Sequence, residues 1–201
     1  MARWVKRVID VGLSTLGIVA AAPIVAVAAV AIRMESDGPA IFKQERIGRD
    51  GAPFEILKLR TMTKDASKSG PGIAANDPRI TRVGSALRAT SIDELPQLVN
   101  VFKGDMSLVG PRPTLGYQVE QYTPRQRRRL EVRPGITGWA QVNGRNELSW
   151  AKRIELDIWY IDNWSNKLDM QIIGMTARRV LGREGTYSAS GGTTLFSEGA
   201  L

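Results

Sequence analysis

One long segment near the start of the chain contains no charged residues. Residues 11–32 form an uncharged run of 22 residues, VGLSTLGIVAAAPIVAVAAVAI, which as a helix could cross about 30 Å of hydrocarbon. Lysine and arginine flank the run on both sides, at residues 3–7 and 33–49, so both ends have the character of cytoplasmic flanks. Pro23, at the middle, interrupts helical hydrogen bonding. The pattern favours a kinked re-entrant helix; a kinked spanning helix and a signal peptide are the alternatives.

The pattern then changes to extended segments. Residues 40–49 and 53–61 are separated by Asp50-Gly51, which predicts a hairpin with a two-residue turn. Period-two alternation places Lys58 and Arg60 on the same face of the second strand. Two cations on one face could hold a diphosphate, and the alternative is an ordinary solvated face.

Helical spacing of apolar residues returns after a small, polar, Gly/Pro-rich loop at residues 63–78. Ile80, Val83 and Leu87 predict a helix that ends near Arg88. Residues 147–183 predict two more helices, which either pack on the core or lie at a membrane interface. Their apolar positions at helical spacing are Trp150, Ile154, Ile158, Ile161 and Trp164.

Two adjacent carboxylates, Asp93 and Glu94, stand between these helical patterns and directly ahead of Pro96. A helix accommodates proline within its first turn, so the helix carrying the apolar residues 95, 98 and 99 should begin close to Asp93 and bury them. A helix N-terminus favours anions, so Asp93 should stay ionised there. These features suit a carboxylate nucleophile that acts on a phosphorylated substrate. The alternative is an S-x-x-E capping box from Ser91, in which Glu94 only bonds back to the serine backbone.

Glycine, proline and arginine are dense in two later loops. Arg112 lies between two prolines, which present its guanidinium from a rigid turn and so reduce the entropy lost on binding an oxyanion. Residues 133–146, RPGITGWAQVNGRN, can bring backbone amides close to a phosphate, and Arg145 adds a forked donor. Neither a P-loop nor a dinucleotide GxGxxG motif is present, so neither of those nucleotide sites is supported.

Composition limits the chemistry further. The 201 residues include neither cysteine nor histidine, which excludes disulfides, thiolate or imidazole zinc sites and a Ser-His-Asp triad. The net charge of +8 indicates a polyanionic partner, and six arginines lie between residues 112 and 133. We favour contact of these arginines with anionic headgroups over a solvated helix face. A nucleic-acid-binding protein is the rival class, but it leaves residues 11–32 unexplained.

These motifs, in this order, resemble the bacterial sugar transferases, the monotopic polyprenol-phosphate phosphoglycosyl transferases, over residues 5–183. The resemblance rests on the following stretches: Lys6-Arg7 with Asp10, Pro23, KLRTM at 58–62, SIDELPQLVNVFKGDMSLVGPRP, RPGITGWAQVNGRN and Asp169.

The resemblance implies that Asp93 attacks the sugar-bearing phosphorus of a UDP-sugar and releases UMP. The phosphosugar then passes to a polyprenol phosphate, usually undecaprenyl phosphate, in the first membrane step of glycan assembly. Glu94, with Asp93, would bind Mg²⁺. The other implied site residues are Arg88 in catalysis and Lys58, Arg60, Arg112, Gln141 and Arg145 in substrate binding.

The resulting fold prediction is α+β and mostly helical, with an N-terminal kinked re-entrant membrane helix, a short β-hairpin and amphipathic interfacial helices around a compact catalytic core. The expected divisions are a membrane-inserted segment 1–36, a catalytic domain 37–184 and a loose tail 185–201. The expected location is the cytoplasmic face of the inner membrane. The expected partners are a UDP-sugar, polyprenol phosphate and an anionic bilayer, without nucleic acid; the sugar and any homo-oligomeric assembly are left open.

Overall fold

The described part of the chain is mostly helical with two small sheets, which confirms the α+β prediction. The computed structural model describes residues 2–64, 66, 77–144 and 148–181; the expected tail 185–201 and Arg145 lie outside these ranges. The longer elements are α1 (Ala2–Glu35), β1 (Ile41–Ile47), β2 (Pro53–Leu59), α2 (Arg82–Ala89), α3 (Gln97–Lys103), α7 (Trp150–Asp162) and α8 (Asn166–Leu181). The short elements are η1 (Arg49–Gly51), η3 (Ile92–Glu94), β3 (Ser107–Val109), α4 (Gly116–Glu120), α5 (Pro124–Arg127), η4 (Arg128–Glu131), β4 (Gly135–Thr137) and α6 (Trp139–Val142).

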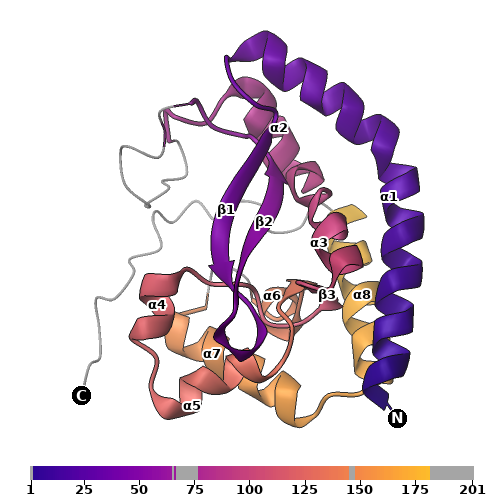
Figure 1. Ribbon diagram of the computed structural model, residues 1–201, viewed down its shortest axis with the longest axis vertical. Helices are drawn as coiled ribbons and strands as arrows, with labels where there is room; N and C mark the ends of the chain where they lie inside the picture. Colours follow the sequence, from indigo (N-terminus) through magenta and orange to yellow (C-terminus); the bar gives the residue numbers. More distant parts are fainter. Residues whose placement is uncertain (1, 65, 67–76, 145–147, 182–201) are drawn as a thin grey trace.

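Helix α1 runs along one side of the molecule and bends along its length (Figure 1). From Arg3 to Glu35 it is long and apolar enough to cross a membrane, and it contains Pro23. Large apolar side chains are exposed along the whole helix: Trp4, Val8, Leu13, Leu16, Val19, Ile24, Val27, Val30 and Met34. An exposed apolar surface of this extent marks a site of contact with a membrane or another protein.

The N-terminal part of α1 is bound to the rest of the chain by buried polar groups. Lys6 Nζ lies 2.6 Å from Asp169 Oδ2 of α8 and donates a second hydrogen bond to the Val109 carbonyl at 3.1 Å. Asp10 is buried, and its carboxylate accepts a hydrogen bond from the Leu108 amide at 3.0 Å. These contacts attach α1 to both α8 and β3.

The C-terminal end of α1 is attached to the same folded unit. The Glu35 carboxylate accepts hydrogen bonds from the Arg82 and Val83 amides, at 2.8 and 3.0 Å, and so satisfies two free donors at the start of α2. The Arg60 guanidinium, just past β2, donates to the carbonyls of Ser36, at 2.7 Å, and Asp37. Both ends of the long helix are therefore held by one body.

Strands β1 and β2 form the predicted antiparallel hairpin, with Ile41 opposite Leu59 and Ile47 opposite Pro53. The predicted two-residue turn was wrong, because residues 48–52 separate the strands. The Ile47 amide donates outward to Thr114, so the loop closes one residue later through Gly48 N and Ala52 O. A second sheet, the parallel pair β3 and β4, was not predicted.

The carboxylate pair lies in the 3₁₀ turn η3, and α3 begins three residues later. The predicted buried face of this helix was wrong, since residues 95, 98 and 99 are only half-buried. The buried residues are Gln97, Asn100 and Val101. The Asn100 side chain forms hydrogen bonds with the backbone of β2. It accepts from the Leu57 amide at 3.0 Å and donates to the Glu55 carbonyl at 2.7 Å. A polar face therefore packs inward because the hairpin supplies backbone partners.

The two helices predicted for residues 147–183 are α7 and α8. Ile154 and Ile158 are buried, and Trp150 and Trp164 pack against core clusters, so this face of α7 belongs to the core and the interfacial alternative does not describe it. Trp159 remains exposed on the other side and stacks on Trp139, with ring centroids 4.8 Å apart.

Three arginines of the segment that was predicted to contact headgroups have acidic partners within the protein itself. They form ion pairs with acidic residues of α7, because α5 and η4 pack beside that helix: Arg125–Glu155 at 2.7 Å, Arg128–Asp162 at 2.6 Å and the buried Arg129–Asp157 at 2.7 Å. These arginines neutralise acidic groups of the protein itself, so they do not form a free cationic surface.

Candidate active site

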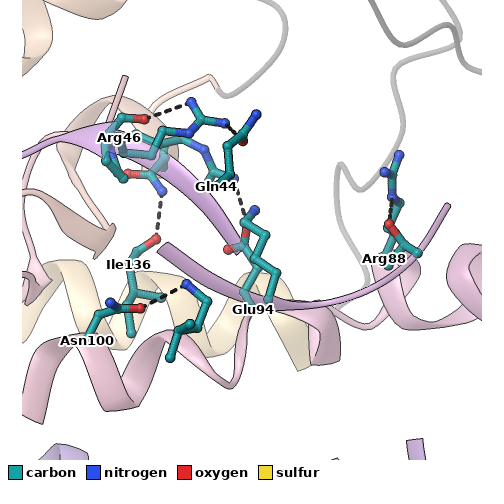
Figure 2. A network of polar contacts seen from close by, with 12 residues as sticks. Gln44, Arg46, Arg88, Glu94, Asn100 and Ile136 are labelled. Atoms are coloured by element: carbon teal, nitrogen blue, oxygen red, sulfur yellow. Dashed lines mark hydrogen bonds and ion pairs between the residues drawn. The ribbon is translucent and has the colours of Figure 1, made fainter. Parts of the chain in front are cut away.

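Two cations from different elements converge on one carboxylate oxygen. Lys58 Nζ from β2 lies 2.8 Å from Glu94 Oε1, and Arg112 Nη2 from the loop after β3 lies 2.6 Å from the same atom. Figure 2 shows Glu94 within a network of polar contacts, with Arg88 drawn apart from it. The sequence-predicted residues Lys58, Glu94 and Arg112 are therefore brought together.

Glu94 was predicted either to cap a helix with Ser91 or to belong to a functional site, and its contacts decide between these two roles. Ser91 has left-handed backbone angles, with φ 58°, and makes no side-chain capping bond, so the alternative capping box does not form. Burial opposes ionisation of Glu94, but the charges of Arg112 and Lys58 and their hydrogen bonds outweigh it, and its pKa lies well below the ordinary value. Burial lowers the pKa of Lys58, although the negative charge of Glu94 acts to raise it.

Asp93 lies next to this group and is 9% exposed. It accepts no hydrogen bond and forms no ion pair with any residue that the structure describes. Burial first, and the neighbouring charge of Glu94 second, raise its pKa, while Lys58, Arg88 and Arg112 act in the opposite direction. A helix N-terminus was predicted to keep Asp93 ionised. Because η3 is a single 3₁₀ turn, burial and the charge of Glu94 outweigh that effect on the pKa of Asp93. The result is a buried, unpartnered carboxylate beside three cations.

Arg88 lies in the last turn of α2, as predicted, and its charge acts to lower the pKa of Asp93. Its Nε donates to Thr61 Oγ1 at 2.8 Å, which orients the guanidinium. The approach of α2 to the end of β2 requires Gly84, because a Cβ at that position would lie 2.1 Å from the Thr61 carbonyl oxygen. Thr61 and Gly84 are positioning residues that the sequence patterns did not single out.

The Arg112 turn is held by two further arginines that sequence reasoning missed. Arg129 donates to the Arg112 carbonyl at 3.1 Å, and Arg46 of β1 donates to the Pro113 carbonyl at 3.3 Å and to Gln44 Oε1 at 2.6 Å (Figure 2). Burial and the charge of Arg112 lower the pKa of Arg46 to about 10. The only sequence signal was the cationic character of β1.

Two predicted substrate contacts, Arg60 and Gln141, do not join this group in the described structure. The Arg60 guanidinium is buried and bonds the backbone at the end of α1, although it was expected to act together with Lys58. Gln141 donates from its amide to the Ile136 carbonyl at 2.9 Å (Figure 2). Arg145 lies outside the described residues. Asp169, from the matched C-terminal motif, binds Lys6, Tyr160 and Trp164 in the core.

The sequence pattern of one family, described as bacterial sugar transferase, matches residues 1–183. The chain belongs to the bacterial sugar transferase family. Its members are phosphoglycosyl transferases, so the acidic and cationic group described above lies in an enzyme of that class.

Relatives of this sugar transferase include proteins named as sugar-1-phosphate transferases. It is 47% identical over 180 residues to the uncharacterized sugar transferase EpsL of Bacillus subtilis, covering 90% of this chain and 89% of that protein. It is also 47% identical over 194 residues to a UDP-glucose:undecaprenyl-phosphate glucose-1-phosphate transferase of Caulobacter vibrioides, covering 90% and 72%. An Escherichia coli enzyme of that same name is 44% identical over 185 residues, covering 87% of this chain but only 39% of that protein.

The sugar transferase offers oxygen ligands that fit the predicted Mg²⁺. Mg²⁺ is usually held by one or two carboxylates together with substrate phosphates and water. Two cations share Oε1 of Glu94, which leaves its second oxygen and the carboxylate of Asp93 as the donors in this group. No cluster of three or more acidic, histidine or cysteine residues suited to a metal occurs within the described ranges. A site of one or two carboxylates is what a substrate-completed Mg²⁺ site requires.

Proposed function

We propose that this chain transfers a sugar 1-phosphate from a UDP-sugar to a polyprenol phosphate, with undecaprenyl phosphate as the acceptor. The acceptor and the donor class follow from the names of the Caulobacter vibrioides and Escherichia coli relatives. The products are UMP and a polyprenyl diphosphosugar. The observation that carries the proposal is the buried Asp93, which has no hydrogen-bond or ion-pair partner among the described residues and lies beside a glutamate on which Lys58 and Arg112 converge.

In the first step, an oxygen of Asp93 attacks the sugar-bearing phosphorus. A bond forms from this oxygen to phosphorus, the bond from phosphorus to the bridging oxygen breaks, and that oxygen leaves with its electron pair on UMP. Asp93 accepts no hydrogen bond from the described residues, so its oxygens are available to the substrate. Lys58, Arg88 and Arg112 are near enough to neutralise the charge on the transferring group.

In the second step, a phosphate oxygen of the polyprenol phosphate attacks the same phosphorus. The bond to Asp93 breaks, and the carboxylate returns to its starting state. Glu94 and Asp93 would hold Mg²⁺, which when bound supplies charge neutralisation for the diphosphate. Neither step needs a histidine or cysteine, which the chain lacks.

We further propose that α1 enters and leaves the membrane on the cytoplasmic side. A straight helix of 34 residues would be about 50 Å long and would place its ends on opposite faces of a bilayer. Support for re-entry comes from the attachment of both ends to one body, through Lys6–Asp169 and through Glu35 to α2. Pro23 and the exposed apolar stripe agree with a helix that dips into one leaflet.

The alternative hypothesis, a nucleic-acid-binding protein, is weakened by the contacts of the arginine cluster. The arginine cluster that supported it is largely paired with acidic residues of α7. Steep salt-dependent binding of DNA or RNA would restore that reading.

The deciding experiment incubates the purified full chain with Mg²⁺ and each of a panel of UDP-sugars, without acceptor. We expect one or more sugars to give stoichiometric UMP and an intact-mass increase equal to a phosphosugar, located on Asp93 by peptide mapping. Addition of polyprenol phosphate should discharge the adduct. A label on another side chain, or UMP release without any adduct, would overturn the covalent mechanism.

A further inference from the structure

Gln97, the first residue of α3, is among the most buried polar residues of the protein. Its side chain is 1% exposed, and its Nε2 atom has no hydrogen-bond partner among the residues that the structure describes. A buried donor left without a partner costs about 1–3 kcal/mol. A buried polar group without a hydrogen-bond partner is rare in native proteins, and one explanation is that the group takes part in a functional site.

The two active-site carboxylates lie shortly before Gln97 in the chain. Asp93 and Glu94 are four and three residues earlier, and the intervening Leu95 and Pro96 have right-handed helical backbone angles. On a helical backbone, residues at these separations are neighbours, with Cβ atoms about 5–6 Å apart. Glu94 Oε1 already accepts two hydrogen bonds, whereas Asp93 accepts none from the described residues. Asp93 is therefore the carboxylate with unused acceptor capacity.

We propose that Gln97 is a positioning residue for Asp93. Its amide nitrogen donates to one carboxylate oxygen of Asp93 when substrate is bound, and the other oxygen is thereby directed at phosphorus. In the phosphosugar intermediate the same donor binds the remaining carbonyl oxygen of the acyl phosphate. The inference deepens the proposed function and rests on it, because it requires Asp93 to be the nucleophile.

The benefit of such a hydrogen bond is orientation. A carboxylate without partners can rotate about its terminal bond, so its two oxygens exchange places and spend little time aligned with the target. Anchoring one oxygen removes that freedom before the reaction, and errors of about 1 Å in such alignment can cost roughly 100-fold in rate. Burial strengthens the effect, because a hydrogen bond is electrostatically stronger in the interior than in water.

Asn100 provides a matched control within the same helix. It is another buried amide, one turn further on, but its side chain is fully engaged with the backbone of β2 at Leu57 and Glu55. Asn100 is therefore a structural amide, whereas Nε2 of Gln97 has no hydrogen-bond partner to lose among the described residues.

The test compares Gln97→Met, Asn100→Met and the wild type as full chains in detergent micelles. Each is given a reactive UDP-sugar and Mg²⁺ without acceptor, and the rate of adduct formation is followed by intact mass and UMP release. For Gln97→Met we expect a rate constant about 100-fold lower, an unchanged KM for the UDP-sugar and an unchanged or higher melting temperature. For Asn100→Met we expect a lower melting temperature and a nearly unchanged rate constant per folded molecule.

A second variant, Gln97→Glu, keeps the side-chain volume but replaces the donor with an acceptor, and it should be slower than Gln97→Met. The inference is overturned if Gln97→Met forms adduct at the wild-type rate, or if it loses stability as Asn100→Met does while keeping its rate. If the wild type itself forms no adduct with any UDP-sugar, the proposed function fails and takes this inference with it, so the two failures are distinguishable.

Discussion

Lys6 and Asp169 are 163 residues apart in the chain, yet Lys6 Nζ lies 2.6 Å from Asp169 Oδ2. The carboxylate is also bonded by the Tyr160 hydroxyl, at 2.8 Å, and by the Trp164 indole, at 3.2 Å. A charge on α1 is therefore neutralised inside the core next to α8. This pair fixes where the long apolar helix meets the rest of the protein.

We expect Asp169→Asn to destabilise the protein by about 3 kcal/mol, because it leaves the largely buried Lys6 ammonium without a counter-charge. Chemical unfolding in micelles measures the loss, and hydrogen exchange should show that the first turns of α1 open most easily. The control is Glu155→Gln, which breaks the exposed pair with Arg125 and should have no measurable effect. Equal losses in the two variants would contradict a special role for the Lys6 pair.

Asp93→Asn should abolish UMP release, by at least about 1,000-fold, since an amide cannot serve as the attacking group. Its free energy of unfolding should stay the same or rise, because burial disfavours the charge that the substitution removes. UMP release and melting temperature are the two readouts. Asp50→Asn, in the exposed turn of the hairpin, should leave both unchanged; retention of turnover in Asp93→Asn would sink the assignment of the nucleophile.

Glu94→Gln should reduce stability in a way that depends on pH. Its folded pKa is lower than the ordinary 4.5, so its stabilising contribution is complete at neutral pH and is lost as pH falls below about 4.5 towards the folded value. The variant should be less stable than the wild type by about 3 kcal/mol at pH 7, because Lys58 loses its buried counter-charge, and the difference should shrink at pH 3.

Denaturant titrations at the two pH values check this expectation. UMP release should also fall in Glu94→Gln, since the glutamate anchors Lys58 and Arg112 and supplies an oxygen for Mg²⁺. A lower melting temperature with intact turnover would mean that Glu94 only supports the structure.

Gly84→Ala should lower both stability and turnover, because the new Cβ would lie 2.1 Å from the Thr61 carbonyl oxygen and push α2 away from β2. That movement displaces Arg88, whose Nε is bonded to Thr61. The control is Gly174→Ala in α8. Apart from the backbone of its own helix, no described atom lies within 4 Å of a Cβ added there, so this substitution should stabilise the protein by up to about 1 kcal/mol through helix propensity. Melting curves and initial rates of UMP release separate the two, and similar behaviour at both positions would contradict the packing argument.

The topology of α1 can be tested cleanly because the chain contains no cysteine. We expect Arg3→Cys and Met34→Cys to react with a membrane-impermeant maleimide from the same, cytoplasmic face of oriented vesicles, and Val19→Cys to be protected by lipid. Asp50→Cys, in the exposed hairpin turn, is the reference for the face on which the rest of the protein lies. Labelling of the two helix ends from opposite faces would show a spanning helix instead.

Local patterns predicted the elements well where one periodicity dominates. The uncharged run of residues 11–32, the apolar spacing before Arg88 and the two C-terminal helices all correspond to observed helices. Local reasoning failed at α3 and at the hairpin turn. In both places the decisive hydrogen bonds come from distant residues: Asn100 bonds β2, and Ile47 bonds Thr114.

The long apolar helix, the helical and hairpin segments and the adjacent carboxylates could be predicted from local patterns, because each depends on side-chain type and spacing within a few residues. The pairing of charges could not be predicted in this way. Lys58 and Arg112 converge on Glu94, whereas Arg60 turns to the end of α1 and the arginines of α5 and η4 turn to α7. A buried charge must find its partner through space, and that partner is set by how elements far apart in the chain pack together.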